Sequence, residues 1–222
     1  MSWRIEYADG YYEGEATDSG KPNGHGTYYW NTGDRFEGEW NLGSRASGRG
    51  IYVWADGSWY DGEWRGSKRH GIGTMHTADG IYTGGWYMNK RHGHGIYSTY
   101  DGAVYDGDWQ EDEITGAGNF TAPDGTWYYG GWECGKRSGR GRQVYSDGSS
   151  YDGEWENDIP MGDGCYTLAD GTSYDGIFND RDSDAVECML PDGRIIEGSM
   201  KGGAFTPKTA SAKGRTDGNN KL

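Results

Sequence analysis

Pairs of carboxylates recur along the chain, with one residue between the two members of each pair. Two carboxylates can carry out acid–base chemistry such as glycoside hydrolysis. An active site is a single arrangement, however, whereas these pairs return in several copies of a segment of 22 to 24 residues that repeats along the chain. We call each copy of this segment a unit. We therefore expect no enzyme activity, and a solvated acidic face or a surface for a basic partner. The pairs are Glu13 and Glu15, Glu37 and Glu39, Asp61 and Glu63, Asp106 and Asp108, and Asp152 and Glu154.

Histidine and cysteine, the usual ligands of transition metals, are sparse. His70 and His92 occupy equivalent places in neighbouring units, about 10 Å apart if each unit is one hairpin of a sheet. That distance is too long for a shared zinc ion, which needs three or four convergent ligands. The three cysteines form no Cys-x-x-Cys pair, and their odd number indicates no disulfide framework. We expect no metal and no cofactor, and a role for His70, His92 and His94 in stabilising turns.

A Gly-x-Gly motif recurs once per unit. No copy opens a helix as Gly-x-Gly-x-x-Gly, and none carries the Lys-Ser/Thr of a phosphate-binding P-loop. The motif therefore favours close packing of strands over nucleotide binding. Its copies begin at Gly24, Gly48, Gly71, Gly93, Gly116, Gly139 and Gly162.

Basic residues precede several of these motifs and are expected to lie along one long edge of the molecule. One interpretation is a row of solvent-facing turn residues that offsets the acidic face. The alternative is binding of anionic lipid headgroups, to which each basic residue near a membrane contributes only about 1 kcal/mol. The candidate lipid-binding residues are Lys68, Arg69, Lys90, Arg91, Lys136 and Arg137.

Aromatic residues give the clearest pattern. Because a single-layer sheet is expected to leave part of each ring exposed, the rings form a contiguous apolar surface of the kind that marks interaction sites. Tyr and Trp are also enriched at interface hot spots, and a partner helix lying in a groove is one binding mode. The candidate protein-binding residues are Tyr60, Trp64, Tyr82, Trp86, Tyr105, Trp109, Tyr128, Trp132, Tyr151 and Trp155.

The elements that position these residues follow from a fixed period. The aromatic residue that opens each Tyr-x-Gly-x-Trp-like unit, or its substitute, falls at positions 12, 36, 60, 82, 105, 128, 151, 174 and 196. A period of 22 to 24 residues predicts a repeat array, in which each small unit packs on its neighbours. The 42 glycines and 33 aromatic residues fit such an array better than one globular core.

An Asp-Gly pair lies four residues before most of these aromatic residues, between two aromatic-rich segments. Gly accepts the positive φ of tight turns, so the pattern predicts a hairpin in each unit. The fold expected is all-β, an elongated single-layer antiparallel meander of about nine hairpins over residues 1–201, joined by linkers of five to seven residues such as 65–70. The hairpins expected are 1–16, 24–40, 48–64, 71–86, 93–109, 116–132, 139–155, 162–178 and 184–200.

Side-chain alternation along a strand assigns the residues to faces. Tyr60, Gly62 and Trp64 should share one face, and Asp61 and Glu63 the other. The glycines leave room for a ring from a neighbouring strand to lie over the backbone. We expect each Trp to pack on the next hairpin and so couple the units.

Charge and composition limit the partners. The net charge is −14, and residues 201–222 carry five Lys or Arg and one Asp, so residues 1–200 carry −18. An acidic body disfavours nucleic acid and bulk anionic membrane. The N-terminus is no signal peptide and no apolar run approaches about 20 residues, so we expect a cytoplasmic protein that is not transmembrane. Residues 202–222 are polar and predict a disordered tail, and the sheet's end strands could pair two chains into a homodimer.

The unit as a whole resembles the MORN repeat (membrane occupation and recognition nexus). The fullest match comprises residues 60–64, 68–73 and 79–80, and the resemblance covers about residues 1–200. It implies single-layer hairpin repeats with an aromatic-lined groove, and non-catalytic scaffolding, often at membranes, cytoskeleton or cilia of eukaryotes. Some members are proposed to bind phosphoinositides, and others bind protein helices or self-associate. The function expected is a scaffold that binds a protein segment in the aromatic groove, with phosphoinositide binding through the basic residues as the alternative.

Overall fold

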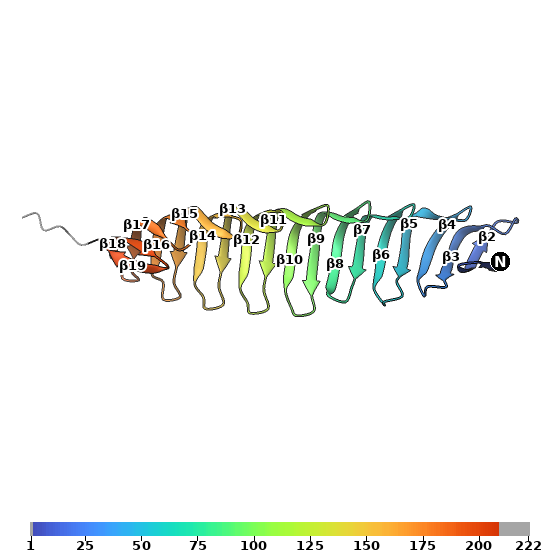
Figure 1. Cartoon of the computed structure of the whole chain (residues 1–222), viewed down its shortest axis with the longest axis horizontal. Coiled ribbons are helices and arrows are strands. Elements are labelled where there is room, and N and C mark those ends of the chain that lie inside the picture. Colours follow the sequence, from blue (N-terminus) through green and yellow to red (C-terminus); the bar gives the residue numbers. More distant parts are fainter. Residues whose placement is uncertain (1, 209–222) are drawn as a thin grey trace, which may run out of the picture.

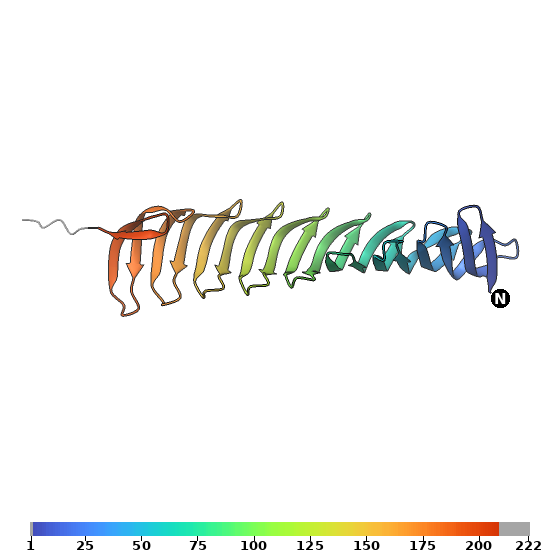
Figure 2. The same ribbon diagram turned by 60° about the horizontal axis from the view of Figure 1, so that its bottom comes forward.

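The protein is one long antiparallel sheet. The computed structural model describes residues 2–208, in which 19 strands follow one another in chain order. Each strand between the two ends pairs with the strand before it and the strand after it, and the result is a narrow, elongated meander (Figure 1). The sheet twists along its length (Figure 2). The expected all-β meander is confirmed, and no helix long and apolar enough to cross a membrane occurs among the described residues.

The strands are short, with 4 to 10 residues each. Their bounds are β1 Trp3–Tyr7, β2 Gly10–Ala16, β3 Pro22–Trp30, β4 Arg35–Asn41, β5 Ser44–Val53, β6 Trp59–Arg65, β7 Lys68–His76, β8 Gly80–Tyr87, β9 Lys90–Thr99, β10 Val104–Gln110, β11 Glu113–Thr121, β12 Trp127–Glu133, β13 Lys136–Val144, β14 Ser150–Glu156, β15 Ile159–Thr167, β16 Ser173–Asn179, β17 Ser183–Met189, β18 Ile195–Lys201 and β19 Ala204–Pro207.

The Asp-Gly loops lie along one long edge of the sheet (Figure 1). In the loop between β5 and β6, the Gly57 amide donates to the Trp54 carbonyl at 3.0 Å and Gly57 has a φ of 87°. The Asp56 carboxylate accepts the Ser58 amide at 2.9 Å, which fixes the turn from within. The same carboxylate–amide bond recurs at Asp124, Asp147, Asp170 and Asp192.

At the opposite edge, the connections between strands are shorter than the linkers of five to seven residues that were expected. Most strands there are joined by two residues only, such as Met88 and Asn89, whose φ values are 53° and 78°. Two positive φ values make a type I′ turn, whose twist suits a tight hairpin. The predicted linker of residues 65–70 is therefore wrong, since Lys68 and Arg69 already belong to β7. The sequence concealed these turns because Met-Asn does not carry the usual Asn-Gly signal.

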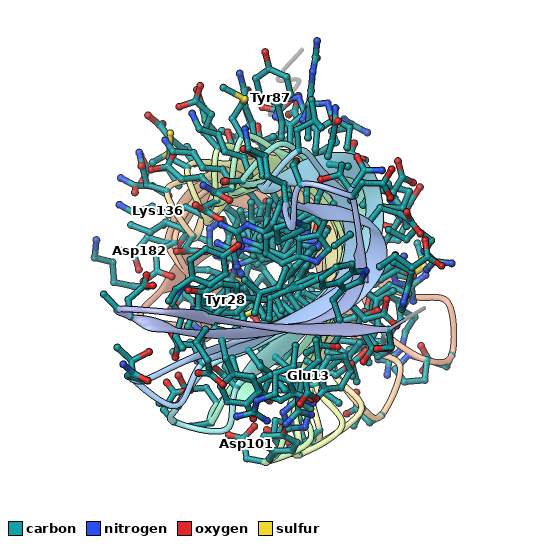
Figure 3. The ribbon with its side chains drawn as sticks, turned by 90° about the vertical axis from the view of Figure 1, so that its right-hand side faces the viewer. Glu13, Tyr28, Tyr87, Asp101, Lys136 and Asp182 are labelled. Carbon is teal, nitrogen blue, oxygen red and sulfur yellow. The ribbon has the colours of Figure 1, made fainter. Side chains whose placement is uncertain are left out.

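A bulge at each Gly-x-Gly motif curls the sheet. Gly62 pairs with Gly73 and Trp64 with Arg69, so three residues of β7 lie opposite Glu63 alone. Bulges of this kind bend a strand and increase its twist. Repeated along the array, they wrap the sheet around its aromatic face, and the rings fill the centre of the cross-section, where Figure 3 shows Tyr28. We refer to this inner face as the trough.

Glycines form an unbroken row along the bend, because the register pairs Gly50 with Gly62, Gly62 with Gly73 and Gly73 with Gly84. The Tyr60 ring lies across Gly62 and Gly73, so a Cβ on either glycine would overlap it. The glycines thus make space for rings, as expected. The ring over Gly62 comes from its own strand, however, whereas the ring over Gly73 comes from the neighbouring one.

The sheet extends further than expected at its C-terminal end. Strand β19, Ala204–Pro207, pairs with β18 and begins inside the predicted disordered tail of residues 202–222. That prediction is wrong for residues 204–207, and residues 209–222 lie outside the described residues. The two end strands, β1 and β19, each have one neighbour, so each leaves one backbone edge unpaired within the described chain.

Candidate functional site

The ten candidate protein-binding aromatic residues all lie on the inner face, but they are not open to a partner. Nine of them are buried, Tyr60 and Tyr151 completely, and only Trp132 is half-buried. The expectation of exposed rings is therefore wrong for these nine. A curled sheet encloses its own concave face, which a flat single layer could not do. Contact between these residues and a partner stays a prediction.

The buried rings form a continuous edge-to-face chain. Trp86 packs against Tyr82 of its own strand at 5.2 Å between ring centroids, and against Tyr60 of the preceding hairpin at 5.3 Å. Its indole nitrogen donates to the Gly73 carbonyl at 3.1 Å. The expected coupling of units by Trp is present, although Trp86 packs back on the preceding hairpin and not on the next one. Such pairs each add about 0.5–1.5 kcal/mol beyond area burial.

The tyrosine hydroxyls are structural groups. Burial raises the pKa of Tyr82, Tyr128 and Tyr151 to about 12. The Tyr82 hydroxyl donates to the Gly85 carbonyl at 2.9 Å. At neutral pH these phenols are therefore neutral and already paired.

The arginines of the candidate lipid-binding set turn inward. Arg69, Arg91 and Arg137 lie over Trp86, Trp109 and Trp155, with 4.4, 4.0 and 4.3 Å from guanidinium carbon to ring centroid.

Polar contacts fix each of these guanidinium groups. Arg91 donates to the Asp112 carboxylate at 3.2 Å and to the Asp112 carbonyl at 3.0 Å. Arg69 donates to the Asn89 carbonyl at 2.9 Å and to the Met75 sulfur at 3.5 Å, and burial lowers its pKa. We call this arrangement, a guanidinium over a ring with a hydrogen bond to a carbonyl, an arginine seat. The seats recur at Arg69, Arg91 and Arg137, with Ile114 at the register position between the last two, and a cavity of about 240 Å³ remains between the first two.

The lysines of the same set remain outside. Lys68, Lys90 and Lys136 are exposed, and Figure 3 shows Lys136 pointing away from the rings. Lys90 pairs with Glu111 at 3.1 Å. The expectation of six basic residues along one edge is therefore wrong for Arg69, Arg91 and Arg137, because strand alternation sends one member of each Lys-Arg pair inward.

The acidic pairs face outward as expected, but they do not form a continuous ladder. Across the strands, Asp61 stands between Ile51 and Thr74. His94 lies on this face, 3.0 Å from Asp106 and 3.7 Å from Asp108. Within residues 2–208, no three His, Cys, Asp or Glu side chains gather closely enough to hold a metal ion.

Towards the C-terminus the arginine seats stop and the trough opens. By register, Pro160 of β15 stands where Arg137 stands in β13, and Phe178 stands where Trp155 stands. A cavity of about 700 Å³ lies in these C-terminal repeats, beside but not lined by Pro160 and Phe178, and we call it the C-terminal groove. Its walls include Tyr145, Tyr166, Leu168, Tyr174, Arg181 and Met200.

One lip of the C-terminal groove is acidic. Asp124, Asp147 and Asp170 of three successive Asp-Gly loops line it, and Arg181 stands among the lining residues as well. Hydrogen bonds from Ser149 hold the pKa of the Asp147 carboxyl below its usual range. Sequence reasoning missed this groove. Its half-buried rings, Tyr145, Tyr166 and Tyr174, were not among the candidate binding residues.

Comparison with protein families identifies the repeats. The model described as "MORN repeat" matches seven consecutive segments, 19–35, 36–59, 60–81, 82–104, 105–127, 128–150 and 151–173. The chain belongs to the MORN-repeat family. The matched segments end at residue 173, so part of the C-terminal groove lies in strands that depart from the family pattern. MORN repeats are typical of scaffolds associated with proteins or membranes.

Solved structures add little. The TCP10 domain of CPAP from Danio rerio is 12% identical, with 93% of this chain and 100% of that chain covered and a TM-score of 0.46. A mutant of the same domain is also 12% identical, with 93% of this chain and 99% of that chain covered and a TM-score of 0.45. The G-box domain of the microcephaly protein CPAP is 12% identical, with 89% of this chain and 97% of that chain covered and a TM-score of 0.36. No curated protein matches the chain. TM-scores of this size support no statement about partners or location.

Proposed function

We propose that this chain is a non-catalytic scaffold that holds a segment of a partner protein in the C-terminal groove. One observation carries the proposal. Over the middle repeats the trough is narrow, with arginines seated on its rings and a cavity of about 240 Å³ between Arg69 and Arg91, whereas it widens into a cavity of about 700 Å³ at the C-terminal repeats.

The chemistry of the groove supports protein binding. Its volume falls within the range of about 300–1,000 Å³ typical of ligand sites. Tyr145, Tyr166 and Tyr174 are half-buried, so part of each ring is accessible, in contrast to the nine buried candidate rings. The sheet behind them is held by the edge-to-face chain, and a rigid site loses less entropy on binding.

Other expected properties also stay proposals. Family membership favours a cytoplasmic place at cytoskeletal, ciliary or membrane-associated structures. The unpaired edges of β1 and β19 favour a homodimer through the sheet ends. The repeated acidic pairs and the neutral tyrosines favour a non-catalytic role.

Selection from a random peptide library displayed on phage tests the proposed site. The groove variant is Leu168→Arg, and the matched control is Ile177→Arg, which makes the same change on the outer face at a side chain that is 69% exposed. We expect to recover peptides that bind the wild-type protein and the control variant but do not bind the groove variant. Peptides that bind all three proteins equally, or no enriched peptides, would contradict the proposed site.

Phosphoinositide binding is the alternative, and one observation favours it: Lys68, Lys90 and Lys136 remain exposed. Three lysines supply only about 3 kcal/mol near an anionic surface, and the acidic body opposes them. In sedimentation with vesicles containing phosphatidylinositol 4,5-bisphosphate at physiological salt, we expect no binding. Sedimentation that is lost when the three lysines are replaced by glutamate would establish the alternative.

A further inference from the structure

We propose that the C-terminal groove takes a polyproline II segment that carries arginine at every third residue. The inference rests on the proposed function, since it names the chemistry of the segment that the same groove would hold. Three features carry it: the pitch of the acidic lip, the way in which the trough already holds its own arginines, and the charge of the groove.

The pitch of the lip matches one backbone conformation. Asp124, Asp147 and Asp170 recur once per hairpin, which is two strand spacings or about 9.4–9.8 Å. A polyproline II helix rises about 3.1 Å per residue and returns to the same face every third residue, or about 9.3 Å. In a β strand, side chains three residues apart point to opposite faces, so successive third residues could not all meet the lip. An α-helix, which advances about 1.5 Å per residue, does not complete a whole number of turns over the spacing between lip carboxylates, so its side chains would not return to the same face.

The floor of the groove suits the same conformation. Tyr145, Tyr166 and Tyr174 present partly accessible rings along it. Polyproline II segments usually bind in aromatic-lined grooves, because such segments are already extended before they bind and so lose little conformational entropy.

The trough itself shows how it holds a cation. Arg137 stacks on Trp155 at 4.3 Å, and donates to the Asp158 carboxylate and the Asp158 carbonyl, each at 3.0 Å. Planar guanidinium groups suit this combination of ring and carboxylate better than ammonium groups do. In the next hairpin Pro160 replaces the arginine by register, and the accessible rings shift to Tyr145, Tyr166 and Tyr174, which line the groove together with the three lip carboxylates. A partner's arginine would find there the combination of ring and carboxylate that Arg137 uses within the chain.

The charge of the groove selects the sign of the partner. Three carboxylates and one guanidinium, that of Arg181, are among its lining residues. Each carboxylate accepts an amide of its own turn through one oxygen, at 2.8 Å for Asp124 and Asp170 and 2.9 Å for Asp147. The negative charge of the lip and of the body attracts a basic segment, while Arg181 opposes it. Removing Arg181 should therefore strengthen binding of a basic segment and weaken binding of an acidic one.

Fluorescence anisotropy with a synthetic peptide tests the inference. The probe is a labelled twelve-residue peptide of four Arg-Pro-Leu units. Comparison peptides have lysine in place of arginine, or the same composition with the arginines clustered. The groove variant is the triple change Asp124→Asn, Asp147→Asn and Asp170→Asn, in which asparagine can still accept the turn amides. The matched control is Asp61→Asn, Asp106→Asn and Asp152→Asn, which removes the same charge from the outer face.

We expect the groove variant to weaken binding of the probe about tenfold, since each exposed ion pair supplies about 0.2–1 kcal/mol. The outer-face control should change it less than twofold, Arg181→Gln should tighten it, and both comparison peptides should bind more weakly. Equal loss in the two triple variants, equal binding of the clustered peptide, or weaker binding by Arg181→Gln would overturn the inference.

The proposed function can survive that result. Library peptides that require an intact groove but lack arginine at every third position would contradict the inference and support the scaffold. If no peptide depends on Leu168, both fail together.

Discussion

At the scale of the residue, the molecule depends on tyrosines that lie flat over glycines. Tyr60 covers Gly62 of its own strand and Gly73 of the next, and its hydroxyl donates to the Glu63 carbonyl at 3.0 Å. Because the ring and the two backbones already touch, the site has no space for a methyl group. This relationship could be predicted from the spacing of Tyr and Gly, since alternate residues of a strand share a face.

Replacing Gly73 by alanine is expected to destabilise the protein by about 1–3 kcal/mol, because the new Cβ overlaps the Tyr60 ring. In a Tyr60→Leu background the same change should cost much less, since the ring is gone. Urea unfolding of the wild type, the two single variants and the double variant gives the coupling free energy between positions 60 and 73. Equal costs of Gly73→Ala in both backgrounds would show that the ring does not limit this position.

Alkaline pH should unfold the protein through its buried tyrosines. Burial raises the pKa of Tyr12, Tyr82, Tyr128 and Tyr151 from about 10 to about 12. The unfolded chain therefore loses these protons first, so stability is complete below pH 10 and falls as pH rises towards 12. Phenolate absorbance and circular dichroism should change together in this window. Exposed tyrosines such as Tyr87, Tyr100 and Tyr129 should form phenolate near pH 10 with the fold retained. Phenolate formation by all 18 tyrosines near pH 10 with the fold retained would contradict burial of these rings.

At the scale of the element, the two ends of each hairpin differed in how well they could be predicted. Asp-Gly identifies its loop, because Asp bonds the turn from within and Gly accepts positive φ. The opposite turns use residues such as Met88 and Asn89, whose types carry no such signal. That error had a consequence for the site. Without a two-residue turn, the alternation that sends Arg69 inward and Lys68 outward could not be derived.

The tryptophan that joins successive hairpins should dominate stability over the outer face. Trp86→Ala removes a buried ring and its bond to Gly73, and is expected to cost about 3–5 kcal/mol. Glu63→Ala changes an exposed side chain and should cost about 0.5 kcal/mol or less. Thermal unfolding measures both. Equal melting temperatures would contradict packing through the ring chain.

At the scale of the whole molecule, the array is one structural unit whose trough is narrow along its middle and wider towards its C-terminal end. The period, the all-β class and the elongated shape could be predicted, because they follow from regular spacing alone. The curl could not, since it comes from a bulge at every Gly-x-Gly, and a bulge depends on register between strands. Curling buries nine of the ten candidate binding rings and leaves Tyr145 and Tyr166 partly accessible in the C-terminal groove.

Deuterium exchange of the wild-type protein, with and without a bound peptide from the library, tests the central claim that partners bind at this open end. Protection is expected in the loops that line the groove, at residues 124–126, 145–149 and 166–170. Strands β6 to β10, where the rings are buried, should exchange as in the free protein. Protection spread evenly over those strands, with none at the C-terminal loops, would contradict the account.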